Sequence, residues 1–268
     1  MRRPARSTLI MAILLLAASR LASQEPHLDK NDMPMQPNGR WPMHDPTRPQ
    51  PRVVIPAPAP AEPVAAPTDA TILLGARDDL TGWQTLDGRP ATWRMSNGVV
   101  EVGGGDIRTR QEFTDFQLHV EFATPADVRG DGQGRGNSGV YLLGAFEIEI
   151  LDSYRNPTYP DGQAAAMYGQ YPPLVNASRL PGEWQTYDIT FTAPRFEGAS
   201  LVKPAIVTVL HNGVLVHNAT AFWGPTAHAT LLPYNPNVTR GPIMLQDHGN
   251  PVRFRNIWIR AVADYDEP

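Results

Sequence analysis

Two glutamates separated by one residue are the groups in this chain best suited to acid–base chemistry. Residues 146–152 read Phe-Glu-Ile-Glu-Ile-Leu-Asp, and the alternation of apolar and acidic residues predicts a strand. Glu147 and Glu149 then share one face, with Cα atoms roughly 6.5 to 7 Å apart. Two ionised carboxylates at this spacing repel, which raises the pKa of one and favours a general acid–base pair. The alternative is two solvated acids on an exposed sheet face.

A second candidate group lies near the C-terminus, in the segment Leu245-Gln-Asp-His248. Alternation along an extended chain puts Gln246 and His248 on one face, and Leu245 and Asp247 on the other. Histidine changes its charge near neutral pH, so His248 is a candidate to move or donate a proton. A purely structural hydrogen bond at the end of a strand is the alternative.

The elements expected to position these groups are strands, because the apolar residues recur with a period of two. In Phe116-Gln-Leu-His-Val-Glu-Phe122 the apolar residues face one way, while His119 lies on the polar face and is expected at the surface. Asn212-Gly213, between the β-rich runs 205–211 and 214–218, predicts a tight hairpin. Residues 182–193 and 252–262 also read as strands, whereas 163–167 reads as at most one helical turn. The pattern predicts an all-β, antiparallel sandwich.

The N-terminal quarter of the chain lacks the strand pattern of the rest. Arg2, Arg3 and Arg6 precede an apolar run from residue 9 to 18, and small residues follow, so residues 1–23 are predicted to be a cleaved signal peptide. An uncleaved anchor is the alternative. Residues 24–68 carry twelve prolines and are predicted to be a disordered, proline-rich linker that lies loosely on the domain. The folded domain is expected at 69–263, with a short tail at 264–268.

The composition excludes several classes of function. The chain of 268 residues has a formal net charge of −4 and no cysteine. The absence of cysteine excludes disulfides, thiol catalysis and thiolate metal sites. Beyond the N-terminus it has no block of basic residues, so nucleic acid is not an expected partner. Export and cleavage leave no stable membrane insertion, and predict a secreted or periplasmic protein.

Six segments lie in this order along the chain: Gly136-Asn-Ser-Gly-Val-Tyr141, Phe146-Glu-Ile-Glu-Ile-Leu-Asp-Ser153, Met167-Tyr-Gly169 with Pro172-Pro-Leu-Val-Asn-Ala-Ser178, Pro181-Gly-Glu-Trp-Gln-Thr-Tyr-Asp188, His211-Asn-Gly-Val214, and Leu245-Gln-Asp-His-Gly249 with Arg253-Phe-Arg-Asn-Ile-Trp258. Together these six segments resemble the 3-keto-disaccharide hydrolase domain. The resemblance implies a concanavalin A-like jelly roll with its ligand site on the concave face. It also implies activity on an oligosaccharide or glycoside whose sugar carries a ketone at C3.

A weaker resemblance lies inside the second segment. Glu147-Ile-Glu-Ile-Leu-Asp152 is similar to the Glu-x-Asp-x-x-Glu strand of retaining endoglucanases of this fold, in which a bulge returns the last carboxylate to the face of the first two. Here the middle and last acids are exchanged. Asp152 is therefore predicted either to contact substrate or to cap a turn at the end of the strand.

A ketone at C3 suggests the mechanism. The C2 hydrogen becomes acidic, a base removes it, the group on C1 is expelled, and water adds to the product. Glu147 or Glu149 is predicted as the base and His248 as the acid or as a donor to the enolate. Such a substrate requires a partner enzyme, a sugar 3-dehydrogenase, to introduce the ketone.

Further residues are predicted to bind the sugar. Asn137 and Gln246 are candidates to bind hydroxyl groups, and Tyr168 and Asn176 to form a rim on the loop 155–180. Trp184 either stacks on a sugar or joins the core. The remaining two, Arg253 and Arg255, either support the enolate electrostatically or form structural ion pairs.

No cofactor is predicted. A divalent metal held by Glu149, Asp152 and His248 is an alternative electrophile, although the sequence has no dense spacing of metal ligands. Two other functions also stay open: a non-catalytic carbohydrate-binding module, and a conventional glycosidase that uses Glu147 with Glu149 or Asp152.

Overall fold

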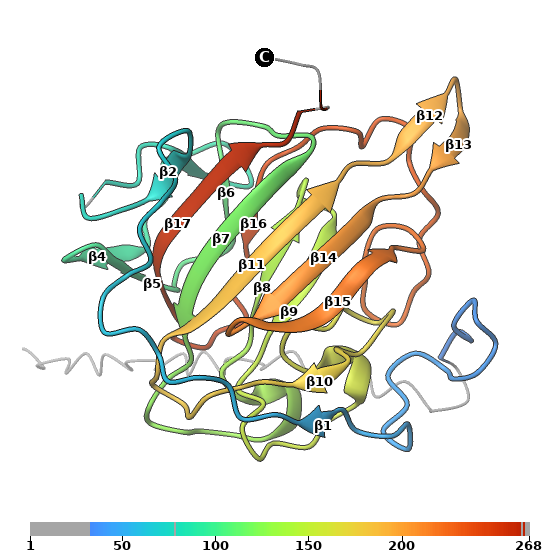
Figure 1. The fold of residues 1–268 in the computed structure, drawn as a ribbon, viewed down its shortest axis with the longest axis horizontal. Helices are drawn as coiled ribbons and strands as arrows, with labels where there is room; N and C mark the ends of the chain where they lie inside the picture. Colours follow the sequence, from blue (N-terminus) through green and yellow to red (C-terminus); the bar gives the residue numbers. More distant parts are fainter. Residues whose placement is uncertain (1–32, 78, 264, 266–268) are drawn as a thin grey trace, which may run out of the picture.

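A computed structural model describes residues 33–77, 79–263 and 265 of the chain. These residues form two packed antiparallel sheets joined by long loops (Figure 1). The larger sheet has the order β15-β14-β11-β7-β17-β5-β4, with β2 also paired to β17. Its strands are β2 (Thr71–Leu74), β4 (Arg94–Ser96), β5 (Val99–Glu101), β7 (Phe116–Ala123), β11 (Gln185–Thr192), β14 (Ile206–His211), β15 (Val214–Ala221) and β17 (Arg253–Ala261).

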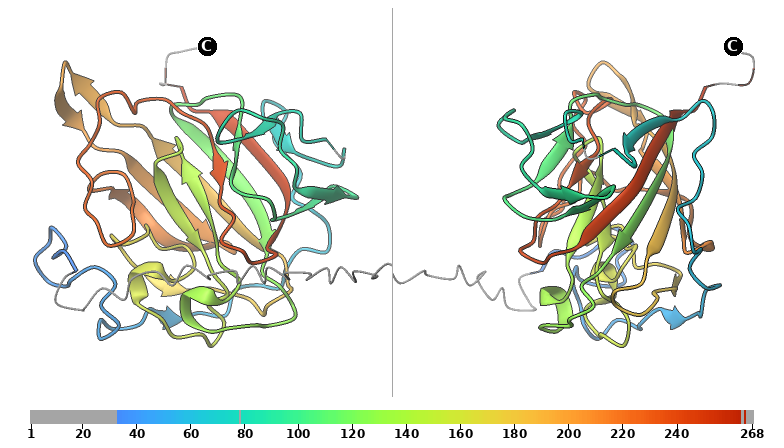
Figure 2. Two further views of the ribbon diagram at one scale, coloured as in Figure 1. Left: turned by 180° about the vertical axis from the view of Figure 1, so that it is seen from behind. Right: turned by 90° about the vertical axis from the view of Figure 1, so that its left-hand side faces the viewer.

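The smaller sheet, in the order β3-β6-β16-β8-β9, carries the acidic pair. Its strands are β3 (Trp83–Thr85), β6 (Ile107–Thr109), β8 (Ser138–Leu142), β9 (Phe146–Ile150) and β16 (Met244–Leu245). Seen from behind, its yellow-green strands lie in front of the larger sheet (Figure 2). Apart from these sheets, β1 (Arg52–Val53) pairs in parallel with β10 (Val175–Asn176), and β12 (Arg195–Glu197) pairs with β13 (Ser200–Lys203). The predicted all-β, antiparallel jelly-roll sandwich is confirmed.

The core lies between the two sheets and follows the predicted alternation. Phe116, Leu118, Val120 and Phe122 of β7 are fully buried and belong to one hydrophobic cluster with the apolar residues of β9. The hairpin at residues 212–213 also forms as predicted, since both residues have positive φ angles, 54° and 77°, as the two-residue turn requires.

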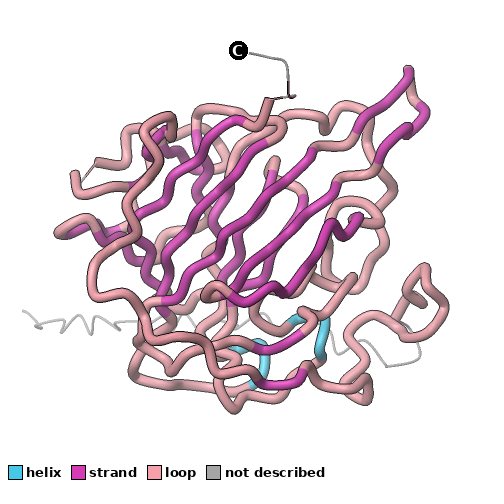
Figure 3. The backbone as a smooth tube through the Cα atoms, viewed as in Figure 1, coloured by secondary structure: helices cyan, strands magenta, loops and turns pink. Residues whose placement is uncertain are grey.

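Residues 163–167, which read as at most one helical turn, form none. In the part of the chain that the structure describes, the helical elements are two short 3₁₀ turns, η1 (Gly132–Gly134) and η2 (Pro160–Gly162), which lie at the same end of the sandwich (Figure 3). Residues 164–168 instead run along the free edge of β9. Ala165 donates its backbone N–H to the carbonyl of Glu149 at 2.8 Å, and Glu149 donates to Ala166 at 3.0 Å. The unpaired edge of β9 thus captures a segment whose three alanines would otherwise favour a helix.

The expectation of a loose, disordered linker at residues 24–68 is wrong for the part that the structure describes. Residues 33–68, called the N-terminal strap below, are docked on the sandwich: β1 pairs with β10, Arg179 donates to the carbonyl of Ala57 at 2.9 Å, and Glu121 accepts the N–H of Val64 at 2.9 Å. Figure 1 shows the strap passing beneath the sheets beside β10 and then rising to β2. Proline supplies the extended backbone, and side chains of the domain bind its free carbonyls and amides.

The predicted signal peptide, residues 1–23, lies outside the described residues, as do residues 24–32 and most of the tail. Among the residues that are described, no helix has the length and apolar character needed to cross a membrane.

Candidate active site

A cavity of about 560 Å³ lies on the face of the smaller sheet that is turned away from the core. It is lined by Gln133, Gly134, Asn137, Tyr141, Glu147, Glu149, Tyr159, Tyr168, Ala227, His228, Gln246 and His248. The acids come from β9, Tyr141 comes from β8, and Gln246 and His248 follow β16. Six of the residues singled out from the sequence, Glu147, Glu149, His248, Asn137, Gln246 and Tyr168, therefore share one cavity.

The two acids are held side by side by strand geometry. Opposite Glu147 in β8 stands Tyr141, and opposite Glu149 stands Gly139. Both acidic residues are almost fully buried, with 2% and 1% exposure. Gly139 makes this possible, because a Cβ at that position would collide with the carboxylate of Glu147 and with the ring of Tyr141. The glycine of the Asn-Ser-Gly segment thus provides the space in which one carboxyl group lies.

Tyr141 fixes the orientation of the first acid. Its hydroxyl group hydrogen bonds to the carboxylate of Glu147, and the side-chain amide of Gln246 donates to that hydroxyl at 3.3 Å. The backbone N–H of Glu147 donates to the hydroxyl of Thr226 at 3.0 Å. By contrast, Oε1 of Glu149 is buried and has no hydrogen-bond partner.

These surroundings give the two acids different pKa values. Burial raises the pKa of Glu147, and the hydrogen bond from Tyr141 partly offsets that rise. Burial also raises the pKa of Glu149, and the charge of Glu147 raises it further. The pair therefore gives up its two protons in two separate steps. In the intermediate state Glu147 carries the charge and Glu149 keeps its proton, so one site holds both a base and an acid.

A second wall of the cavity consists of aromatic residues. The hydroxyl of Tyr168 lies 3.1 Å from that of Tyr159 and 3.0 Å from Nδ1 of His228. Sequence reasoning found Tyr168 but missed the other two and Tyr141. Tyr141 lies in the segment 136–141, and its alternation with Gly139 was the available signal. Tyr159 and His228 lie in irregular loops where no periodicity marks them.

The opposite rim carries donors from two loops. His248 is exposed at the mouth of the cavity. Asn137 is buried, and its side-chain amide donates to the carbonyl of Gln133 at 2.9 Å. Asn137 thus also anchors the loop that closes this side of the cavity.

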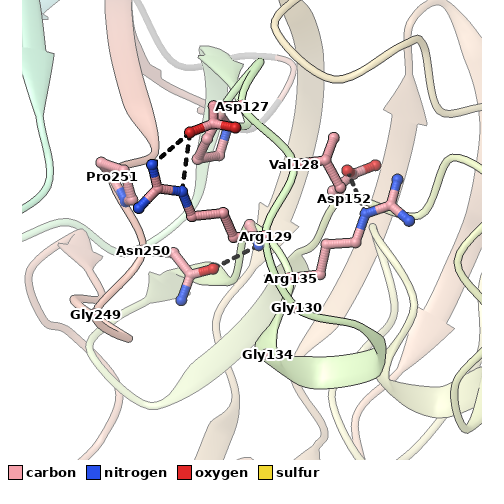
Figure 4. A pocket seen from close by; sticks show the side chains of 12 residues that line it. Asp127, Val128, Arg129, Gly130, Gly134, Arg135, Asp152, Gly249, Asn250 and Pro251 are labelled. Atoms are coloured by element: carbon pink, nitrogen blue, oxygen red, sulfur yellow. Dashed lines mark hydrogen bonds and ion pairs between the residues drawn. The ribbon is translucent and has the colours of Figure 1, made fainter.

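Asp152 lies outside this cavity. The strand ends at Ile150, so no bulge returns Asp152 to the face of the two glutamates. Its carboxylate accepts a hydrogen bond from Arg135 at 2.7 Å and lines a neighbouring pocket of about 490 Å³ (Figure 4). It also caps a turn by accepting the N–H of Tyr154 at 3.1 Å.

Four more predicted residues lie elsewhere. Asn176 donates to the carbonyl of Ser153 at 2.9 Å, under the strap. Arg255 stacks its guanidinium over Trp184 at 4.1 Å and pairs with Glu121 at 2.6 Å. Arg253 also lies over Trp184, at 5.4 Å. Arg253, Arg255 and Trp184 thus lie on the outer face of the larger sheet, whereas the two acids belong to the smaller sheet.

His119 belongs to the same outer face, and the expectation that it is plain surface is wrong. It is 1% exposed, hydrogen bonds to Asp188 at 2.7 Å and stacks on Trp258 at 5.1 Å. The polar face of β7 is covered by neighbouring side chains and by the strap, which periodicity within one strand does not reveal.

The three residues considered as metal ligands are not brought together, since Asp152 lines a different pocket from Glu149 and His248. More generally, the described part of the chain contains no cluster of three or more histidine, cysteine or acidic residues suited to hold a metal ion.

A jelly-roll sandwich with a polar, acid-lined cavity on its outer face defines a carbohydrate-active protein. Residues 70–260 match the model of the 3-keto-alpha-glucoside-1,2-lyase-like domain, and the chain belongs to this family. No curated protein matches it.

Solved structures agree with the family assignment. A candidate glycosyl hydrolase from Parabacteroides distasonis ATCC 8503 is 43% identical, with a TM-score of 0.68 over 74% of this chain and 85% of that one. A second candidate glycosyl hydrolase from the same organism is 20% identical, with a TM-score of 0.55 over 73% and 94%, and shares the fold.

Proposed function

We propose that this protein cleaves 3-keto-glycosides by abstraction of the C2 proton and elimination of the group on C1. The observation that carries the proposal is the buried, unequal pair of acids in one cavity, since the elimination needs both a base and an acid beside the same sugar. The name of the matching domain, 3-keto-alpha-glucoside-1,2-lyase-like, supports the substrate class.

The ionised Glu147 takes the proton from C2, and the electron pair of the C–H bond forms an enolate with its charge on the C3 oxygen. His248 at the rim, or Asn137, donates a hydrogen bond to this oxygen. The enolate then collapses and the bond from C1 to the leaving oxygen breaks, while Glu149 gives that oxygen its proton. An unsaturated 3-keto sugar and a free alcohol result, and addition of water to the former completes a net hydrolysis.

Two parts of the proposal concern the cellular setting. The predicted signal peptide supports export to the periplasm or beyond. The required ketone supports a pathway partner that oxidises C3 of the sugar, because the reaction as written neither gains nor loses electrons.

The test is incubation of the purified protein with a 3-keto-glucoside, beside the same glucoside without the ketone. Release of the alcohol from the ketone only, slowed by deuterium at C2, is the expected result. Equal turnover of both glucosides would instead indicate a conventional glycosidase. Binding of the sugar without turnover of either would identify a carbohydrate-binding module.

A further inference from the structure

The N-terminal strap reaches the cavity wall through one side chain, His44. Its side chain is 2% exposed, and its ring centroid lies 4.3 Å from that of Tyr159, 5.1 Å from Tyr168 and 4.9 Å from His228. The rings of His44 and His228 are stacked, with planes 15° apart. All three neighbours line the cavity, so His44 packs directly behind the aromatic wall.

The strap is seated there by a buried carboxylate. Asp161, with 0% exposure, accepts the backbone N–H of His44 at 2.9 Å and the side-chain amide of Gln36 at 3.2 Å. Asp161 belongs to the turn η2, which follows Tyr159 directly. The turn that grips the strap is therefore the turn that carries one residue of the wall.

The loop beside the strap is also shaped to receive it. At Gly169, where φ is 68°, a Cβ would lie 2.5 Å from the terminal carbon of Met43 and 3.4 Å from the ring of His44. Met43 itself is 1% exposed. The positive φ favours glycine at this position next to Tyr168, and a Cβ would also push the end of the Met43 side chain aside.

His44 also ties two loops together. Its Nε2 accepts the backbone N–H of Ala229 at 3.3 Å, so in the neutral ring the proton is on Nδ1. Burial, with a smaller effect of His228, lowers the pKa of His44 to about 3, which keeps it neutral near pH 7. The ring of His44 thus joins the loop of His228 to the loop of Tyr168. The side chains of His228 and Tyr168 are themselves hydrogen bonded, at 3.0 Å.

We propose that His44 is a positioning residue of the active site, and that it acts by holding His228 against Tyr168. The inference rests on the proposed function and deepens it: the strap, which precedes the family domain at residue 70, holds a wall of the catalytic site in place. His44 itself does not line the cavity and touches no substrate.

The first test compares the full-length protein with His44→Ala, His44→Phe and Arg40→Ala. Arg40 is exposed on the same strap and serves as the control. We expect His44→Ala to lower kcat about 10- to 100-fold with KM changed less than about 3-fold, because a displaced His228 and Tyr168 no longer hold the bound sugar in the reactive position against the two acids. Phe keeps the stacked ring and loses the acceptor, so an intermediate loss is expected. A kcat for His44→Ala equal to that of Arg40→Ala would overturn the proposal.

A double variant distinguishes positioning from general destabilisation. If His44 acts through His228, His44→Ala costs less than about 3-fold when it is added to His228→Ala. If the strap merely stabilises the fold, the two losses multiply, and the proposal fails. Thermal unfolding of each variant is measured in parallel, and assays are run well below the lowest midpoint.

The tautomer of His228, followed by its side-chain ¹⁵N signals, needs no substrate. A single tautomer in the wild type and in Arg40→Ala, and a mixture in His44→Ala, are expected; identical signals in all three would contradict the inference. If the wild type cleaves no 3-keto-glycoside, the proposed function fails, while this measurement still decides whether His44 positions His228.

Discussion

Glu147 and Glu149 differ in only a few contacts, yet those contacts decide which acid is the base. Tyr141 donates a hydrogen bond to Glu147, whereas Glu149 keeps a buried oxygen with no partner. A hydrogen bond to the charged form lowers a pKa, and an unpaired buried carboxyl group favours the protonated form. The roles of the two residues therefore follow from their neighbours and not from their type.

Replacement of the base tests this assignment. We expect Glu147→Gln to lower kcat about 10³-fold, since a positioned general base contributes on this scale, while the melting temperature does not fall. The control is Asp152→Asn, which loses the ion pair with Arg135. It should retain kcat within about 3-fold and lose about 1–3 kcal/mol of stability. A loss of activity in Asp152→Asn as large as in Glu147→Gln would favour the conventional glycosidase.

The pH dependence of Tyr141→Phe provides a second test at this scale. The hydrogen bond from Tyr141 lowers the pKa of Glu147, so its removal raises that pKa. The base must be ionised to act, and activity rises with pH as it ionises. The rising limb of kcat/KM should therefore move to higher pH, by on the order of one unit. A limb that stays in place would show that Glu147 is not the base.

At the scale of elements, the pairing of β8 with β9 builds the acidic wall. The register sets Gly139 opposite Glu149 and Tyr141 opposite Glu147, and the captured segment 164–168 completes the other edge. One strand thus carries both acids while its neighbour supplies the space and the donor that they need.

Gly139→Ala tests the need for that space. The added methyl group must displace the carboxylate of Glu147 or the ring of Tyr141. We expect kcat to fall at least about 10-fold and stability to fall by about 1–3 kcal/mol. Gly103→Ala, where a Cβ meets nothing within 4 Å, is the matched control. Equal kinetics and melting temperatures for the two variants would contradict the packing described for β8.

At the scale of the whole molecule, the strap links the two layers of the sandwich. It is bound behind the cavity through His44, below the sheets through β1, and on the outer face of the larger sheet through Glu121. The last contact joins a partly buried network of His119, Asp188 and Arg255.

The network on the outer face makes stability depend on pH. Burial alone would lower the pKa of His119, but its hydrogen bond to Asp188 and the carboxylate of Glu121, 3.6 Å away, outweigh burial and raise the pKa to about 9. A raised pKa stabilises the fold fully below the unfolded value near 6.5, and the effect disappears as pH rises to 9. Between pH 6.5 and pH 9 the free energy of unfolding of the wild type should fall by about 1–3 kcal/mol more than that of His119→Gln. If the free energies of unfolding of both proteins, measured by denaturant titration at each pH, change equally across this range, His119 is not charged in the folded state.

The sequence alone determined the features that depend on short-range periodicity. Alternation placed both acids on one face and the phenylalanines of β7 in the core, and two residues at 212–213 specified a hairpin. These features were predictable because a strand turns successive side chains to opposite faces whatever lies around it. The six segments in order similarly identified the family.

Only the tertiary structure determined which side chains from other segments contact those strand faces. The placement of Tyr159 and His228 beside the acids, of Asp152 on Arg135 and of His119 under neighbouring side chains depends on contacts between residues far apart in the chain. The strap is the clearest case. Its prolines indicate an extended segment but not where it binds, because the carbonyls and amides that it offers are paired by Arg179, Asp161 and Glu121, which lie more than fifty residues away.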